Sequence, residues 1–563
     1  MSTVDWLVLG ITLLSVVAYG IFKSRGTKSI NSFLLADRQL PWYHVGLSVM
    51  ATQASAITFL SAPGQGYSDG LRFVQFYFGL PLAMIVLCIT FIPIFHRLNV
   101  YTAYEYLEKR FDTKTRTLTA ILFLVQRGVS TGITIYAPAI VLSTILNIDI
   151  SYTTVFTGGV VIVYTVYGGT KAVSYTQLLQ MFIIFTGLFL AAYMVVHLLP
   201  QNVGFTDALH IAGKMGKTNA IDTTFDLNNK YNIWSGIIGG FFLQLSYFGT
   251  DQSQVGRYLT GKSIAQSRLG LIMNALVKIP MQFFILLIGV LVFTFYQFHA
   301  PPVFFNKVEV NQVEKGKGKD ELKVLEESHK ELHSQKLIHV NALVDAMHNN
   351  DKSAESAIAV KLQELGKKEK EIRNSVVELI KKESKAADTN DTNYIFLNFV
   401  TTYLPRGLIG LLIAIIFLAS MGSMASGLSS LASTTVVDVY KRLINKNASD
   451  TDCFNASRYT TVGWGVFCIL VALYAGKQGN LIEVVNILGS LFYGTILGVF
   501  VVAFYLKQVG AKAVFYAAIV TECIVIIAWL MDLTAFLWLN VIGCLLVMLL
   551  SMAFQSIFVK SRT

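Results

Sequence analysis

The chain has 563 residues, of which 54% are hydrophobic and 14% charged, and its mean hydropathy is +0.56. A soluble protein carries about 25% charged residues, so the composition excludes a soluble globular protein and indicates an all-α polytopic membrane protein. The net charge of +11 comes mostly from loops between apolar runs, so it reports membrane topology and does not indicate a nucleic-acid partner.

Apolar runs long enough for a bilayer core of about 30 Å recur along the chain. About 13 transmembrane helices are predicted, at residues 4–22, 41–68, 73–95, 117–147, 152–170, 173–199, 231–255, 269–297, 406–437, 459–476, 482–506, 512–531 and 534–557. Lys and Arg gather in the loops on one side, which should be the cytoplasm. This places the N-terminus outside and the C-terminus inside. The first span is expected to be retained, because no A-x-A cleavage site follows it.

The second span, "VGLSVMATQASAITFLSAPGQGY" at residues 45–67, has a small and polar centre. Such a stretch unwinds readily, and free backbone carbonyls at membrane depth are tolerated where they line a cavity or hold an ion. Close helix packing through small residues is the alternative interpretation.

Among the ionisable residues within or at the mouth of spans, we single out Arg127, Asp251, Lys278 and Glu483. Charged groups in a membrane are costly and are functional candidates by default. The alternative for each residue is a structural ion pair or a side chain that reaches the membrane surface.

Residues 303–393 break the apolar pattern, since they hold 16 of the 45 Lys and Arg residues and 17 of the 34 Asp and Glu residues. Two stretches within them have apolar residues at helical spacing with polar turns between. We expect a charged helical hairpin on the extracellular or periplasmic face.

The hairpin carries four histidines: His329, His333, His339 and His348. Two of them are spaced i, i+4 and can bind a metal, whereas solvated histidines are the alternative because nothing like H-E-x-x-H is present. The five cysteines lie outside the hairpin and are too scattered for a metal cluster: Cys88, Cys453, Cys468, Cys523 and Cys544.

The ninth span ends in "FLASMGSMASGLSSLAST", residues 417–434, which is crowded with serines. A broken helix offers carbonyl oxygens and a neighbouring serine-rich helix offers hydroxyls, without the cost of a buried charge. Together the two spans predict a sodium site of the kind found in transporters with discontinuous helices.

The chain resembles the sodium/solute symporters, which include sodium–glucose, monocarboxylate, iodide, multivitamin, proline and sialic acid symporters. The resemblance rests on the order and spacing of "VGLSVMATQASAITFLSAPGQGY", "FIPIFHRLNVYTAYEYLEKRF", "IYAPAIVLSTILNI", "YTVYGGTKAVSYTQLLQ", "GTDQSQVGRYLTGKS" and "GSMASGLSSLASTTVVDVYKR". It implies a LeuT-type core of two inverted five-helix repeats, preceded by one extra span and followed by two.

On this basis the chain divides into five parts. They are an extra span and inner loop (1–40), the first repeat with the start of the second (41–302), the hairpin insertion (303–393), the rest of the second repeat (394–506) and two C-terminal spans (507–563).

The family's sodium site, carried over position by position, implies carbonyl ligands at Ala51, Ala54 and Ala419 and a hydroxyl from Ser423. The other hydroxyl position falls on Gly422. Ser420 or a water can fill this gap, or the affinity for sodium is lower.

Members that couple two sodium ions carry an Asp in the fifth core helix and a pair of hydroxyls one turn past the main site. Here Gln177 stands at the Asp position, and the hydroxyl pair reads Ala425 and Ser426. Losing an anionic ligand removes most of the attraction for a cation, so one sodium per cycle is expected. Ser429 and Ser430, which follow, are expected to be packing positions.

For the solute, two branches of the family give different residues. The sugar-transporting branch implies Gln53, Thr58, Asp251, Lys278 and Glu483 as ligands. The sialic acid branch implies Arg127 for a carboxylate, which Ser55 and Thr58 also meet, with Gln75 or Tyr77 facing them.

A buried Arg favours a planar anion. We therefore expect a sodium symporter for a carboxylate-bearing solute, such as a monocarboxylate, a vitamin-like acid or an acidic sugar. A sodium/sugar or sodium/polyol symporter is the alternative, and a non-transporting sensor or scaffold on the same fold is another. No enzyme is expected, because the sequence shows no nucleophile–base constellation and no phosphate loop.

Overall fold

The computed structural model describes residues 1–24, 35–383, 387–475 and 479–560. Two of the Lys- and Arg-containing stretches used to predict the topology, 23–28 and 559–563, lie partly outside the described residues. The described residues form helices joined by turns and loops, and their only β-type pairing is an isolated bridge between Leu40 and Gly261.

Ten helical segments among the described residues are long and apolar enough to cross a membrane. They are Thr3–Gly20, Ala56–Leu98, Thr113–Leu146, Val173–His197, Ile264–Phe298, Leu408–Ile444, Asp450–Tyr474, Leu481–Tyr505, Ala511–Leu530 and Phe536–Phe558. The count of about thirteen therefore stays a prediction, and three of the predicted spans do not form one long helix of their own.

Two of those three are broken helices. The predicted span 41–68 is divided into α3 (Trp42–Gln53) and α4 (Ala56–Asp69). The predicted span 231–255 is divided into η4 (Ser235–Gly239), α11 (Gly240–Thr250) and α12 (Gln252–Tyr258), where Asp251 leaves the helical conformation.

The third, at 152–170, forms one arm of α9 (Ile150–His197), whose apolar run Ile150–Val166 is shorter than the other spans. The Tyr164 hydroxyl lies 2.7 Å from the Thr176 hydroxyl. In a straight helix twelve residues span about 18 Å, so α9 must bend between its two arms.

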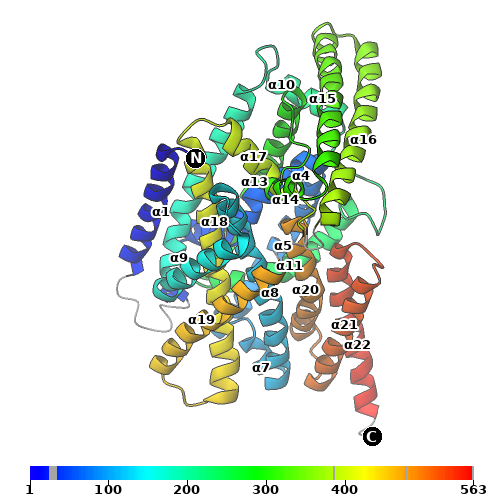
Figure 1. Cartoon of the computed structure of the whole chain (residues 1–563). Coiled ribbons are helices and arrows are strands. Elements are labelled where there is room, and N and C mark those ends of the chain that lie inside the picture. The colour runs from blue at the N-terminus through cyan, green and yellow to red at the C-terminus, as the bar shows by residue number, and fades with distance from the viewer. Residues whose placement is uncertain (25–34, 384–386, 476–478, 561–563) are drawn as a thin grey trace.

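The remaining helices follow in chain order (Figure 1). They are α1 (Thr3–Ser24), η1 (Ala36–Arg38), η2 (Gly70–Tyr77), α5 (Leu80–Val86), η3 (Leu87–Phe91), α6 (Ile92–Leu98), α7 (Glu105–Arg110), α8 (Thr113–Leu146), α10 (Phe205–Lys214), α13 (Ile264–Phe298), α14 (Lys307–Lys315), α15 (Lys319–His348), α16 (Lys352–Glu383), α17 (Thr392–Tyr403), α18 (Leu408–Thr434), η5 (Thr435–Ile444), α19 (Asp450–Ala475), α20 (Leu481–Tyr505), α21 (Ala511–Leu530) and α22 (Phe536–Lys560).

The serine-rich helix α18 is the most enclosed of the long helices. It packs against α1, α8, α9, α19 and both halves of the broken helix α3/α4, and most of its residues are buried. The same broken helix packs along α13, and α11 packs against α20. The two broken helices therefore lie inside the bundle, where water-free lipid does not meet their open backbone.

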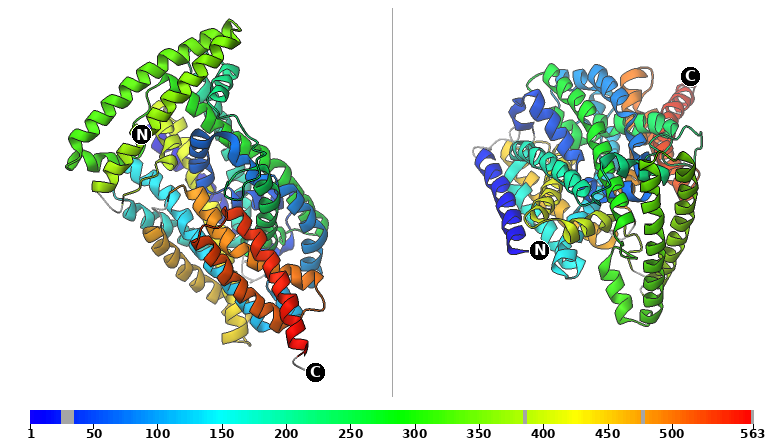
Figure 2. Two further views of the ribbon diagram at one scale, coloured as in Figure 1. Left: turned by 90° about the vertical axis from the view of Figure 1, so that its right-hand side faces the viewer. Right: turned by 90° about the horizontal axis from the view of Figure 1, so that it is seen from above.

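Residues 303–393 contain α14 and two long helices, α15 and α16, that pack side by side and project beyond the bundle (Figure 2). A separate apolar cluster holds their base: Val303, Phe304, Val313, Leu322, Val376, Leu379 and Ile380. The ion pair Arg373–Asp391, at 2.7 Å, joins α16 to the residue that precedes α17.

The paired histidines of α15 are neither solvated nor arranged for a metal. His329 is 3% exposed and lies 3.4 Å from Glu369, and His333 is 8% exposed with Nε2 3.3 Å from the Tyr296 carbonyl. Among the described residues no group of three His, Cys, Asp or Glu side chains can hold a metal ion. The helix pair buries these rings because they face α16 and α13.

Candidate solute and ion sites

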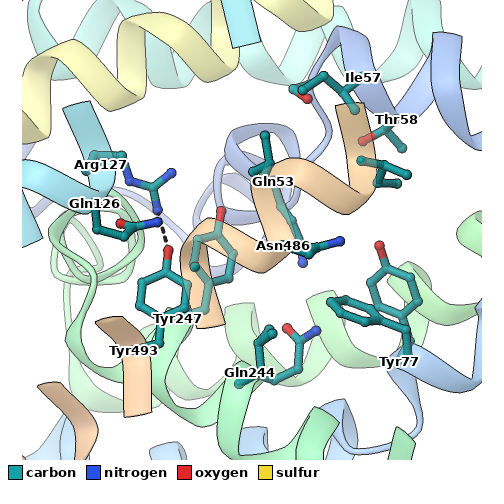
Figure 3. A pocket seen from close by; sticks show the side chains of 16 residues that line it. Gln53, Ile57, Thr58, Tyr77, Gln126, Arg127, Gln244, Tyr247, Asn486 and Tyr493 are labelled. Atoms are coloured by element: carbon teal, nitrogen blue, oxygen red, sulfur yellow. Dashed lines mark hydrogen bonds between the residues drawn. The ribbon is translucent and has the colours of Figure 1, made fainter. Parts of the chain in front are cut away.

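A cavity of about 100 Å³ lies where the break between α3 and α4 meets η2, α8, α11 and α20 (Figure 3). Its lining combines amides, hydroxyls and one guanidinium with apolar side chains: Gln53, Ser55, Ile57, Thr58, Phe76, Tyr77, Gln126, Arg127, Leu243, Gln244, Tyr247, Ile482, Val485, Asn486, Gly489 and Tyr493. Such a mixture of apolar walls and a few polar groups is typical of small-molecule sites.

Arg127 does not stand free in this cavity. Its Nη2 donates to the Tyr493 hydroxyl at 2.9 Å (Figure 3). The same Nη2 donates to Asp251, and the Tyr493 hydroxyl also donates to Asp251, at 2.8 Å. Its Nε is buried without a partner. The guanidinium is therefore charge-balanced by Asp251, and its side chain, 12% exposed, still forms part of the cavity wall.

Asp251 has a structural role that its position in the sequence did not reveal. Its Oδ1 accepts from the backbone N–H and the hydroxyl of Ser253, at 2.8 and 2.6 Å, and so caps α12. Its Oδ2 holds Arg127 and Tyr493. One carboxylate therefore both stabilises the break between α11 and α12 and positions the cation of the cavity.

Five of the nine predicted solute residues line the cavity: Gln53, Ser55, Thr58, Tyr77 and Arg127. Asp251 lies behind Arg127. Gln75 turns away from the cavity, since its amide binds the Tyr231 carbonyl and the Asp222 N–H, each at 3.0 Å.

The other two residues lie outside the lining as well. Lys278 is fully buried without a hydrogen-bond partner, with Nζ 5.7 Å from the centre of the Tyr77 ring. Glu483 accepts from the Tyr231 hydroxyl at 2.9 Å and from Lys230 at 3.0 Å.

Five polar residues of the lining were not predicted from the sequence: Gln126, Gln244, Tyr247, Asn486 and Tyr493. Gln244 and Tyr247 are three residues apart on α11, and Asn486 and Tyr493 are two turns apart on α20. Polar side chains at helical spacing within an apolar run were the available signal.

The break between α3 and α4 frees two carbonyl groups. The Ser55 N–H, which a continuous helix would direct to Ala51, binds Gln53 at 3.1 Å. The Thr58 N–H binds Ser55 at 2.9 Å in place of Ala54. The carbonyl oxygens of Ala51 and Ala54 thus lose the helical donors that would otherwise occupy them.

On the facing helix α18, the Ser423 hydroxyl donates to the carbonyls of Ala419 and Ser420, at 3.0 and 3.1 Å. Its oxygen lone pairs remain available to a cation. The Ser420 hydroxyl contacts the Met424 sulfur at 3.7 Å. The two elements meet directly, because the Thr52 and Ser426 hydroxyls are 3.1 Å apart.

The Gln177 side chain is held by α3 and α18. Its Nε2 lies within 3.1–3.3 Å of the Thr52 and Ser426 hydroxyls and the Gly422 carbonyl, while Oε1 accepts from Ser48 at 2.6 Å. Ala425 is buried and offers no oxygen from its side chain. A neutral amide donor therefore points at the same oxygens that would otherwise face a cation.

Ser429 and Ser430, one turn further along α18, line a small cavity with Arg257. Ser430 donates to the Gly427 carbonyl at 2.7 Å.

The model of the sodium:solute symporter family matches residues 33–313 and 376–521 of the chain. The interval between the two matches falls within the α14–α16 insertion.

Curated relatives carry sodium-coupled transport in their names. The sodium/iodide cotransporter of Homo sapiens is 31% identical over 271 residues, covering 48% of this chain and 42% of that relative. The sodium/glucose cotransporter of Vibrio parahaemolyticus is 26% identical over 527 residues, covering 91% and 82%. Sodium-coupled monocarboxylate transporter 1 of Xenopus laevis is 33% identical over 275 residues, covering 48% and 43%. The first and third alignments thus span less than half of each relative's length.

A solved structure of a sodium-coupled sialic acid symporter, substrate-bound and outward-open, is similar to the whole chain. The TM-score is 0.76 with 22% identity, and the match covers 99% of this chain and 98% of that one. At this identity the likeness shows a shared fold.

Proposed function

This chain belongs to the sodium:solute symporter family, and from its sites we propose that it imports a small polar organic solute together with sodium by alternating access. It is a multi-pass membrane protein and a transporter, not an enzyme. The plasma membrane, of a cell or a bacterium, is where an inward sodium gradient would drive such uptake.

The observation that carries the proposal is the break in α3/α4. It releases the Ala51 and Ala54 carbonyls on a segment that packs against α18, the helix that carries Ser423. Oxygen ligands without a buried carboxylate suit a weakly held, exchangeable monovalent cation. Gln177 supplies a donor where a second cation would need an acceptor, which favours one sodium per cycle.

Coupling follows from the shared segment. The residues that free the sodium carbonyls, 51–55, also include two that line the solute cavity, Gln53 and Ser55. Sodium that fixes this segment improves the solute site, and by linkage the solute improves sodium affinity by the same factor. An inward membrane potential adds about 2.3 kcal/mol per charge per 100 mV.

For the solute we propose a small carboxylate. Arg127 forms part of the cavity wall with its side chain 12% exposed, Ser55 and Thr58 lie on the same lining, and one relative is named for monocarboxylates. A cavity of about 100 Å³ is smaller than the 150 Å³ cavity that admits benzene. In this conformation the volume favours a short acid over a large acidic sugar.

A neutral sugar or polyol is the second candidate. Asp251 already balances the charge of Arg127, and four amides line the cavity: Gln53, Gln126, Gln244 and Asn486. Amides pair well with hydroxyl groups, which donate and accept.

The test is uptake into proteoliposomes driven by a sodium gradient, with a short monocarboxylate, sialic acid, glucose and inositol compared side by side. Ser423→Ala should reduce uptake at limiting sodium. The matched control is Ser457→Ala, which removes a hydroxyl that donates to a carbonyl four residues back on α19, outside both sites.

Sodium-dependent uptake of an acid, weakened by Ser423→Ala and not by Ser457→Ala, supports the proposal. Uptake of glucose or inositol selects the second candidate. If solutes are taken up equally with and without a sodium gradient, sodium symport is overturned. If a normally folded protein takes up none of the solutes, a sensor or scaffold is favoured.

A further inference from the structure

The sodium site described above is one oxygen short, because Gly422 has no hydroxyl. The space beside Gly422 is nevertheless filled. A Cβ added to Gly422 would lie 2.6 Å from Oε1 of Gln180, a residue of α9, and 3.6 Å from Cγ of Gln177. The amide oxygen of Gln180 thus occupies the side of α18 where a serine at position 422 would project.

Gln180 lies one turn after Gln177 on α9 and, unlike Gln177, its amide nitrogen has no hydrogen-bond partner. It is 1% exposed, and its Nε2 is buried with no hydrogen-bond partner. Gln177 instead contacts four partners across α3 and α18. Because the Nε2 of Gln180 has no partner, no donor bond fixes the orientation of this amide, and its Oε1, which lies beside Gly422, can turn toward an ion.

We propose that the side-chain oxygen of Gln180 is the fifth sodium ligand and replaces the hydroxyl absent at Gly422. An amide carbonyl is a neutral, hard oxygen ligand that suits such a cation. The inference rests on the sodium site of the proposed function. It adds α9 to the elements that sodium joins, so that the ion bridges α3/α4, α18 and α9.

The experiment measures sodium binding directly on the purified full-length protein, without solute, by displacement of radioactive sodium. Gln180→Ala should raise the half-saturating sodium concentration about tenfold, as loss of one hydrogen-bond-strength ligand does. Gly422→Ser alone should also weaken binding, because its Cβ collides with Gln180.

The double variant Gln180→Ala/Gly422→Ser tests whether a hydroxyl at position 422 can replace the oxygen of Gln180. The alanine leaves room for the serine, whose hydroxyl restores the fifth oxygen, so affinity should return to within about threefold of the unaltered protein. Gln180→Glu serves as a second variant that keeps the shape. Its carboxylate should bind sodium more tightly at high pH than at low pH.

The matched control is Gln282→Ala. Gln282 on α13 is also fully buried, and both its amide atoms lack partners, but it is not beside Gly422. Sodium affinity should stay within about twofold of the unaltered protein.

The outcomes separate this inference from the proposed function. If Ser423→Ala weakens sodium binding and Gln180→Ala does not, the Gln180 ligand is wrong while symport stands. A double variant as weak as Gln180→Ala, with Gln180→Glu also no tighter, would likewise overturn it. If the unaltered protein binds no sodium, both proposals fail.

Discussion

Gln177 connects three elements of the bundle through a single neutral amide. Its nitrogen faces two hydroxyls and the Gly422 carbonyl, which together form a ring of oxygens. Replacing the amide with a carboxylate would reverse the electrostatics of this ring without moving its members. Under the proposed function, we expect the identity of this one side chain to decide the number of sodium ions per cycle.

Gln177→Asp is expected to create a second sodium site. The Hill coefficient for sodium activation of uptake should rise from about 1 toward 2, since it can reach the number of coupled sites. Gln177→Asn is the neutral control and should leave the coefficient near 1. An unchanged coefficient in Gln177→Asp would mean that this ring, which lacks a hydroxyl at Ala425, cannot hold an ion.

Arg127 and Asp251 form a buried ion pair, with side chains 12% and 0% exposed. Asp251→Asn should destabilise the protein by about 3–5 kcal/mol, because it leaves a buried charge without its partner. Thermal unfolding in detergent measures the loss. Adding Arg127→Gln should recover part of it, whereas Glu364→Gln, which breaks the exposed Lys361–Glu364 pair, should have no measurable effect.

The sequence nominated Arg127 and Asp251 singly, because ionisable residues stand out in apolar runs. It could not show that they pair, since 124 residues separate them. For the same reason the sequence could not show that Glu483 and Gln75 lie outside the cavity lining. Their partners, Tyr231, Lys230 and Asp222, lie in a loop whose position depends on the folded bundle.

At the scale of helices, one break could be predicted and one could not. In residues 45–67, a run of small and polar residues predicts the break. The break at Asp251 has no proline and only Gly249 close by, and it depends on a carboxylate that caps α12. An Asp inside an apolar run resembles a functional charge and a helix cap equally well.

The junction between the insertion and α17 contains a buried acid. Burial raises the pKa of Asp388 to about 7, assisted by the negative charges of Glu309 and Asp391 and opposed by hydrogen bonds from Asn390 and Tyr394. The folded protein favours the protonated form. Protonated Asp388 therefore contributes to the free energy of unfolding. That contribution is fully present below the unfolded pKa of 3.8 and is lost as the pH rises through the folded pKa of about 7.

Raising the pH from 6 to 8 should lower the melting temperature, because the folded protein then loses the proton of Asp388. Asp388→Asn should remove that part of the pH dependence and raise the melting temperature at pH 8. Asp345→Asn, at an exposed position on α15, is the control. An equal pH dependence in Asp388→Asn and the unaltered protein would show that Asp388 stays ionised.

Across the whole molecule, hydropathy was enough to find the long apolar helices, because length and composition alone define them. It could not decide which runs stay continuous, since breaks depend on caps and contacts between distant segments. The views agree that the two termini lie at opposite ends of the bundle (Figures 1 and 2). Hydropathy and charge supply the expectation of which end is outside.

Two introduced cysteines test that expectation. Lys352→Cys, at the start of α16, should react in intact cells with a thiol reagent that cannot cross membranes, whereas Asn447→Cys, between η5 and α19, should not. Both positions are exposed. The background is Cys523→Ser, because Cys523 is the exposed cysteine among the residues that the structure describes. Labelling of position 447 alone would invert the predicted topology.

The α15–α16 pair is held to the bundle at both of its ends. Near the base, Arg373 ties α16 to Asp391, and α17, which follows directly, packs on α4 at the border of the solute cavity. Near the turn, Glu355 of α16 pairs with Lys214 of α10 at 2.8 Å. With 30 residues, α15 is about 45 Å long, so the pair bridges two separate parts of the bundle. A movement of α4 that carried α17 with it would have to bend this bridge or pull on α10, and an antibody fragment bound to the pair would resist that movement from outside the membrane.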